Sequence, residues 1–267
     1  MERVIDVSHH NGSINWAEVK GNVDAAVIRL GFRGYSVGKI AYDNTYKVNR
    51  KACEDLGIPF SLYFFPCSVC DLEAEEEADF IIKEASGMNF ILPVFLDSEV
   101  ADVKRGTGRA DKLSKSERTR YLRIICEKLQ AAGIPVGIYA SKSWFSDRLD
   151  MTQLPYSVWV AQWGDILTYS GPYILWQHTN FGSVPGVSGR VDISRGGSQN
   201  WKDIQVPAQP AYPVQKKVTA NVLNIRKEPT VSSADLGDLI KGSVVTIDRE
   251  EQGFGHIEGW VSMKYVK

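Results

Sequence analysis

Eight short apolar runs divide the first three quarters of the chain and predict β-strands. Val, Ile, Phe, Tyr and Trp dominate these runs, and Gly, Pro or Asn bounds them, which is typical of strands. The runs cover residues 4–8, 25–31, 59–65, 90–99, 135–141, 157–163, 173–179 and 189–194.

Three helical patterns lie between the early runs. They cover residues 45–56, 71–85 and 113–132, and the last opens with a Ser114-x-x-Glu117 capping box. Gly57 and Gly133 follow two of these patterns, and each stands two residues before a proline that bars further helix. Strands and helices that alternate in this way predict parallel βα units.

The last three runs break this alternation. Only nine residues separate the run at 157–163 from that at 173–179, and nine separate the latter from 189–194. Because a parallel crossover needs about a dozen residues or more, we expect antiparallel hairpins here. The predicted fold class is α/β, with an irregular TIM-like (β/α) barrel over residues 1–202 from which some helices are missing.

The end of the chain has a different pattern. Residues 203–216 contain Pro207, Pro210 and Pro213 without periodicity, which predicts an extended linker. Residues 217–267 then give short strand-like pieces at 222–225, 236–240, 244–248, 255–257 and 259–261. We expect a small all-β barrel there.

Composition excludes several classes of protein. The formal net charge is −1 over 267 residues, so nothing in the overall charge indicates nucleic-acid binding. No run of about 18 apolar residues exists, so we expect no membrane partner. Four cysteines are too few for a disulfide scaffold at this length, and the Cys67-x-x-Cys70 pair lacks a second ligand pair for zinc. We therefore expect reduced cysteines.

Two carboxylates end the most apolar run of the chain. Asp97 and Glu99 stand two residues apart, so on a strand they would point to the same side. Asp6 lies in the first run and Asp192 in the eighth, and these two strands are neighbours in a closed barrel. Four acids could then meet at one mouth, where barrel enzymes carry catalytic groups. This cluster suits either acid–base chemistry or an oxygen-ligated divalent metal.

Aromatic side chains near the strand ends favour a sugar substrate over a metal. Aromatic faces stack on the apolar faces of pyranose rings, and a glutamine amide can bond hydroxyl or acetamido groups. Each ring taken alone would more often be core. The candidate substrate-binding residues are Tyr63, Phe65, Tyr139, Trp159, Trp163 and Gln177.

These residues together resemble a known family, glycoside hydrolase family 25, the Chalaropsis-type lysozymes or N-acetylmuramidases. The resemblance runs over residues 4–195 and implies cleavage of the β-1,4 bond between N-acetylmuramic acid and N-acetylglucosamine. It also implies an irregular β/α barrel. The motifs that carry it are Asp6-Val-Ser8 with Asn11-Gly12, Tyr63-Phe-Phe65, Asp97-Ser-Glu99, Gly137-Ile-Tyr139, Trp159-Val-Ala161, Trp176-Gln177 and the segment 184–192.

The resemblance also implies residue roles. Glu99 would be the general acid/base, and Asp97 would act beside it, either as a nucleophile or by orienting a substrate acetamido group. Asp6 and Asp192 match the two outer acids that shape the site. Many relatives have Asn soon after the last acid, where this chain has Ser194. No cofactor and no metal is expected.

The C-terminal pieces resemble a bacterial SH3-like domain, a class that usually binds peptidoglycan. The motifs are Leu223-Asn-Ile-Arg226-Lys-Glu-Pro229 and Gly259-Trp260-Val261-Ser262. The expected partner is therefore bacterial peptidoglycan, while the oligomeric state stays open. The first residues have no apolar signal region. We thus expect a protein that is made in the cytoplasm without a signal peptide and reaches the wall at lysis or by another export route, such as a phage endolysin or a bacterial autolysin.

Two rival functions remain open. One is a non-catalytic wall-binding protein with a degenerate hydrolase barrel, which would bind peptidoglycan without releasing reducing ends. The other is a metal-dependent amidase, which chelators would inhibit. The four histidines, His9, His10, His178 and His256, have no zinc-ligand spacing.

Overall fold

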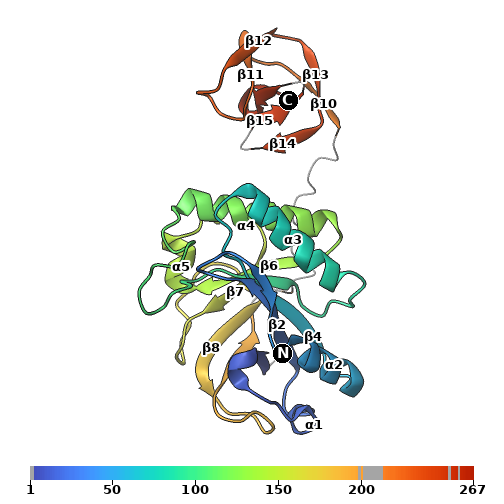
Figure 1. Cartoon of the computed structure of the whole chain (residues 1–267), viewed down its shortest axis with the longest axis vertical. Coiled ribbons are helices and arrows are strands. Elements are labelled where there is room, and N and C mark those ends of the chain that lie inside the picture. The colour runs from blue at the N-terminus through green and yellow to red at the C-terminus, as the bar shows by residue number, and fades with distance from the viewer. Residues whose placement is uncertain (1–2, 198–199, 201–212, 252–253, 258) are drawn as a thin grey trace. The chain divides into compact units, whose positions relative to one another are not determined.

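The computed structural model describes residues 3–197, 200, 213–251, 254–257 and 259–267. The chain forms two compact units, Met1–Val206 and Pro207–Lys267. Their positions relative to one another are not determined, so each is described by itself (Figure 1).

Eight strands of the first unit close into a barrel (Figure 1). Closure occurs where β1 pairs with β2 in parallel and with β9 in antiparallel orientation. The first and eighth predicted strands are thus neighbours, as expected. The strands are β1 (Val4–Val7), β2 (Ala25–Arg33), β4 (Phe60–Phe65), β5 (Val94–Asp97), β6 (Val136–Ser141), β7 (Ser157–Ala161), β8 (Leu175–Gly182) and β9 (Val191–Gly196). A further short strand, β3 (Ile40–Tyr42), pairs with β2 outside the barrel.

The three predicted helices are confirmed. They are α2 (Tyr46–Leu56), α3 (Asp71–Ala85) and α4 (Lys115–Ala131). Ser114 caps α4, with its side chain accepting from the backbone N–H of Glu117, and Gly57 ends α2 with a left-handed φ of 66°. Figure 1 shows α3 and α4 side by side on the barrel. Two short helices were not predicted, α1 (Trp16–Val19) and α5 (Lys142–Asp147).

One predicted strand pairing is wrong. The structure confirms the antiparallel pairing of β8 with β9, but β7 and β8 pair in parallel. Strand β7 ends before its apolar run does, and β8 begins after the start of its run, so the connection spans residues 162–174. That length reaches the minimum for a parallel crossover, and the chain makes it without a helix.

Two apolar layers hold the barrel. Successive side chains of a strand point to opposite faces, so one set fills the barrel and the other packs against the helices. Trp159 is among the largest interior side chains, while Leu62, Phe64 and Leu96 face outwards to the helices. All four cysteines are free, as expected, and only Cys70 is exposed.

The described residues of the second unit form β-strands and one short 3-10 helix, Met263–Tyr265. Five strands match the predicted pieces closely: β11 (Val222–Arg226), β12 (Asp235–Ile240), β13 (Val244–Ile247), β15 (Phe254–His256) and β16 (Trp260–Ser262). Two strands were not predicted, β10 (Val214–Lys217) and β14 (Arg249–Glu251). Its core holds Val218, Leu223, Ile247 and Val261. The predicted linker lies mostly outside the described residues, but its last residues, 214–216, belong to β10.

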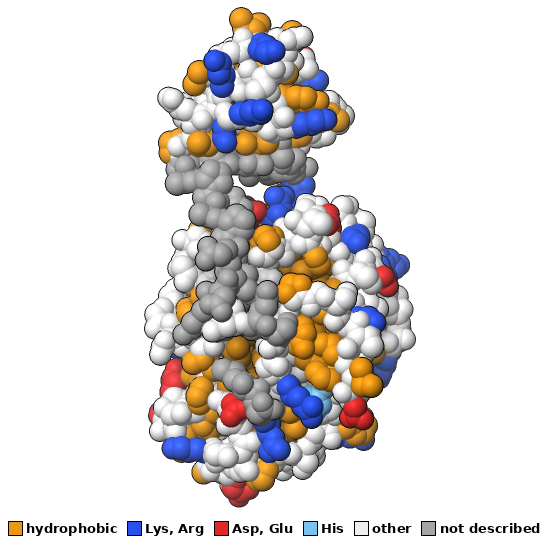
Figure 2. Space-filling model, turned by 180° about the vertical axis from the view of Figure 1, so that it is seen from behind, with side chains coloured by type: hydrophobic (Ala, Val, Ile, Leu, Met, Phe, Trp, Pro, Cys, Tyr) orange, Lys and Arg blue, Asp and Glu red, His pale blue; other side chains and the backbone are white. Residues whose placement is uncertain are grey.

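The surface agrees with the balanced composition. In Figure 2, the described basic and acidic side chains on the visible face are scattered among apolar and neutral ones, without one continuous basic area. Among the described residues, no helix is long and apolar enough to cross a membrane.

Candidate active site

The four predicted acids line one cavity of the first unit, with a volume of about 580 Å³. Asp97 is the last residue of β5, and Glu99 lies two residues beyond the end of that strand. Asp6 lies on β1 and Asp192 on β9, directly opposite each other in the antiparallel pair. Closure of the barrel therefore brings together residues from both ends of the unit's sequence.

Asp6 and Asp192 are hydrogen-bonded to each other. Burial raises the pKa of Asp6 well above its usual value, and the charge of Asp192 raises it further. Burial also raises the pKa of Asp192. Both effects favour the protonated form of Asp6, whose carboxyl can donate a hydrogen bond to Asp192.

Asp97 and Glu99 have raised pKa values as well. Asp97 is only 7% exposed, and burial, followed by the charges of Glu99 and Asp6, raises its pKa well above the usual value. Glu99 is reached by solvent, but the cavity walls remove much of the water around it. This loss of hydration, together with the charge of Asp192, raises the pKa of Glu99 to about 7. Such a group holds a proton near neutral pH and can also release it.

Asp97 has an unpartnered atom. Its Oδ1 is buried and has no hydrogen-bond partner within the described part of the chain. A buried acceptor without a partner costs free energy, which a donor on a bound ligand would recover.

Ser98, which stands between the two acids, anchors the segment that carries them. The Ser98 hydroxyl accepts a hydrogen bond from Trp144 Nε1 of α5 at 3.1 Å, and its backbone N–H donates to the carbonyl of Tyr139. The Trp144 ring makes cation–π contacts with two guanidinium groups, those of Arg118 and Arg148. The segment that carries Asp97 and Glu99 is thus held at side chain and backbone.

Four of the six predicted substrate-binding residues line the cavity, namely Tyr63, Phe65, Tyr139 and Trp159. Tyr63, Tyr139 and Trp159 are at most 9% exposed, and both tyrosine rings contact Trp159 edge-on. They form the cavity floor. Phe65 is only partly buried and is the most accessible of the four.

The other two, Trp163 and Gln177, are not among the described residues that line the cavity. Gln177 is buried at 1% exposure. Its amide nitrogen donates to Asp6 Oδ2 at 3.0 Å and approaches Asp192 Oδ2 at 3.5 Å. Its oxygen accepts from the Tyr139 hydroxyl at 2.9 Å and from Trp163 Nε1 at 3.1 Å. The structure therefore places Gln177 behind the acids, where it orients them.

An ion pair at the cavity wall was not predicted from the sequence. Arg29, on β2, donates from Nε to Oδ2 of Asp43 at 2.8 Å. Asp43 also accepts from the hydroxyl and backbone of Thr45 and from the ring and backbone of His9. The hydrogen bonds from Thr45, followed by those from His9, hold the pKa of Asp43 well below its usual value despite its burial. The charge of Arg29 lowers the pKa of Asp97 and of Glu99, opposing the larger effects of burial.

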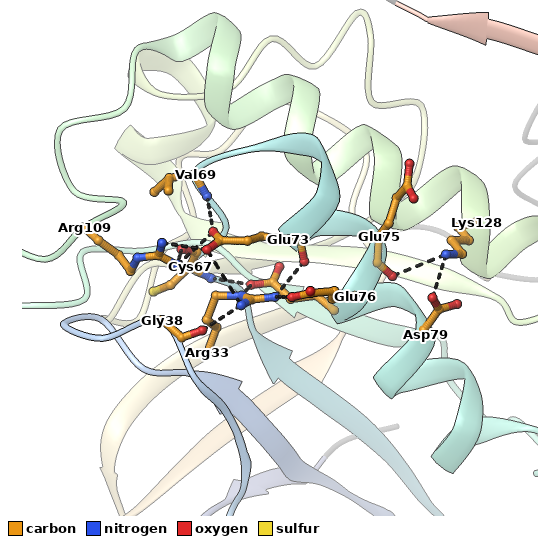
Figure 3. Close-up of polar contacts among 11 residues, drawn as sticks. Arg33, Gly38, Cys67, Val69, Glu73, Glu75, Glu76, Asp79, Arg109 and Lys128 are labelled. Atoms are coloured by element: carbon orange, nitrogen blue, oxygen red, sulfur yellow. Dashed lines mark hydrogen bonds and ion pairs between the residues drawn. The ribbon is translucent and has the colours of Figure 1, made fainter.

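A second arginine of the cavity wall belongs to a buried network (Figure 3). Arg33 donates to Glu77 at 2.7 Å, to Glu76 at 2.9 Å and to the carbonyl of Gly38 at 2.6 Å. Arg109 pairs with both carboxylate oxygens of Glu73, which lies on α3 with Glu76 and Glu77. The network ties the loops around Gly38 and Arg109 to α3.

No group of three or more His, Cys, Asp or Glu side chains that could hold a metal ion is present in the described part of the chain.

Comparisons with known proteins agree with this site. The model of the glycosyl hydrolases family 25 matches residues 5–187. The chain is 24% identical over 195 residues to an autolytic lysozyme of Clostridium acetobutylicum, which covers 71% of this chain and 54% of that protein. It is 26% identical over 204 residues to Lysozyme M1 of Streptomyces globisporus, covering 72% and 66%. The chain thus spans about half to two thirds of the length of these curated relatives.

A solved structure is similar as well. The modular autolysin LytC of Streptococcus pneumoniae matches with a TM-score of 0.63 and 29% identity, over 72% of this chain and 46% of that one. Another structure of LytC contains a synthetic peptidoglycan ligand.

Proposed function

Because this chain belongs to the glycosyl hydrolases family 25, we propose that it is a peptidoglycan hydrolase. It acts as an N-acetylmuramidase and cleaves the β-1,4 bond between N-acetylmuramic acid and N-acetylglucosamine. The observation that carries this proposal is the position of Glu99, a carboxyl with a pKa of about 7 that lines the same cavity as three other acids. The lysozymes and the autolysin to which the chain is similar support it.

Glu99 is the general acid of the proposed reaction. It protonates the oxygen of the leaving sugar as the glycosidic bond breaks through an oxocarbenium-like transition state. A pKa near the working pH suits this role, because the group is protonated in a useful fraction of molecules and still transfers its proton readily. After bond cleavage the carboxylate takes a proton from the incoming water.

Asp97 positions the substrate's own acetamido group. Its buried Oδ1 has no partner within the described residues, and an acetamido N–H would supply the missing hydrogen bond. Held in this way, the acetamido oxygen can stabilise the charge that develops at the anomeric carbon. A direct attack by Asp97 on that carbon is the alternative role.

Asp6 and Asp192 act as a pair that shares one proton. The negative charge of the pair raises the pKa of Glu99, which keeps the acid protonated. Gln177 holds the pair in place through its amide nitrogen. These two acids therefore tune the site without taking part in bond cleavage.

The second unit is an SH3-like domain that binds peptidoglycan and keeps the enzyme at the cell wall. Its all-β architecture and separate core support this assignment. A chain ending at residue 202 should then bind purified cell walls more weakly than the full chain. The enzyme acts on the bacterial wall, which it reaches at lysis or by another export route.

The release of reducing ends from purified peptidoglycan tests the proposed activity. Wild type should release them, and Glu99→Gln should lower the rate by about 10²–10⁴-fold because the proton donor is lost. Glu75→Gln makes the same change at an exposed position of α3 and should match wild type. Wall binding without new reducing ends would support the rival function, a non-catalytic wall-binding protein.

A further inference from the structure

Three arginines line the cavity, and protein carboxylates already neutralise two of them. Arg29 pairs with Asp43, and Arg33 pairs with Glu76 and Glu77 (Figure 3). A guanidinium whose N–H groups are engaged in this way has little capacity left for a further anion.

Arg190 is the third, and it has no carboxylate partner among the described residues. Its guanidinium carbon lies 3.6 Å from the centre of the exposed Phe181 ring. Its backbone carbonyl accepts from the Asn11 side chain at 3.2 Å. Stacking on an aromatic face fixes the plane of the guanidinium but leaves its N–H edge free for hydrogen bonds.

Asn180 adds neutral donors beside this charge. It precedes Phe181 on β8 and also lines the cavity. Its side-chain amide makes no hydrogen bond within the described part of the chain. One wall of the cavity therefore presents an unneutralised guanidinium and a free amide, both of which can donate to an anion.

We propose that Arg190 and Asn180 form a binding site for a carboxylate of the peptidoglycan strand, an inference that rests on the proposed function. Every N-acetylmuramic acid carries a lactyl group that ends in a carboxylate or bears a peptide with carboxylates of its own. The ionised carboxylates of the cavity repel such a substrate. Arg190 offsets this repulsion and recognises the lactyl group, which distinguishes muramic acid from N-acetylglucosamine. The planar N–H edge of its guanidinium matches the geometry of a carboxylate.

Calorimetric binding measurements on the full chain test this site. All proteins carry Glu99→Gln, so that the result does not depend on hydrolysis. The probes are glycan strands with stem peptides, strands stripped of peptide by an amidase, and both again after their carboxylates are converted to methylamides. Arg190→Gln is compared with Arg190→Lys and with Arg195→Gln, which changes an exposed arginine of β9 that does not line the cavity.

Arg190→Gln should weaken the binding of strands with free carboxylates about three- to tenfold. It should leave the binding of the methylamides unchanged, and Arg190→Lys should recover part of the loss. A loss confined to stripped strands identifies the lactyl carboxylate as the ligand, whereas one confined to peptide-bearing strands identifies a peptide carboxylate. Arg195→Gln should change nothing.

Equal losses on the methylamides, or no loss on any strand, would overturn the inference. Neither result bears on hydrolysis, which is measured separately with the protein that retains Glu99. Failure of the carboxylate site and failure of the proposed activity therefore give different results.

Discussion

Gln177 gives the most quantitative test of how the site is held together. The substitution Gln177→Leu keeps a side chain of similar size but removes both its donor and its acceptor. In the wild type the Gln177 amide joins Asp6, Asp192, Tyr139 and Trp163 at 2.9–3.5 Å. The leucine variant leaves these groups without that partner.

The cost of Gln177→Leu follows from which partners are buried. Tyr139 is 9% exposed and Asp6 is 8% exposed, so water cannot easily replace the lost amide there. Trp163 is 60% exposed, and water can replace the amide at its indole N–H. Each buried polar group left without its partner costs about 1–3 kcal/mol, and Asp6 keeps Asp192 as a second partner. We therefore expect a loss of about 2–4 kcal/mol in the free energy of unfolding.

Urea unfolding followed by near-ultraviolet circular dichroism measures this loss, and the Tm should fall by about 4–16 °C. The pKa of Asp6 should rise further, because the hydrogen bond from Gln177 lowers it. Gln153→Leu is the control, since Gln153 is exposed and, among the described residues, its side chain bonds only to Asp150. Its effect should stay within about 0.5 kcal/mol. A Gln177→Leu protein as stable as this control would refute the network as a support for the site.

Three further predictions concern the acid, its support and the stability of the barrel. The value of kcat/KM should fall as pH rises above about 7, because Glu99 then loses its proton, and Asp192→Asn should move this limb to lower pH; a pH–rate profile that stays level to pH 9 would contradict this. Trp144→Phe removes the hydrogen bond to Ser98 and should lower kcat about five- to tenfold, because the segment that carries Asp97 and Glu99 is then held less firmly. Ser98→Ala should have the same effect, and kinetics of the double variant should show no added loss. Burial raises the pKa of Glu77 from 4.5 to about 7, so its contribution to stability is complete below about pH 4.5 and is lost as pH rises through 7. The midpoints of urea unfolding should therefore fall between pH 5 and pH 8. A fall of the same size in Glu77→Gln would show that another group causes it.

The sequence predicts those parts of the site that depend on strand order. Asp6 and Asp192 could be placed together because a closed barrel makes its first and last strands neighbours, and the register confirms that they face each other. Helix limits were predictable where local chemistry sets them, as with the Ser114 cap and the left-handed Gly57.

Features that depend on tertiary packing were beyond the sequence. Arg29 and Asp43 meet only because β3 returns the chain along β2, and no periodicity marks that pair. Gln177 looked like a substrate ligand because it stands beside aromatic residues, but its side chain turns inward to the acids. The parallel pairing of β7 and β8 was missed because apolar residues continue past the ends of the strands. Side-chain direction and strand length are decided by packing, which residue type alone does not specify.

The identity of the sugar at the new reducing end tests the central claim most directly. Peptidoglycan digested by the wild-type chain is reduced with borohydride and analysed by mass spectrometry, with Glu99→Gln as the comparison. The proposed mechanism predicts that N-acetylmuramic acid becomes the reduced sugar in the wild-type digest and that the Glu99→Gln digest is nearly devoid of it. Reduced N-acetylglucosamine in its place, or equal products from the two proteins, would contradict a muramidase that depends on Glu99.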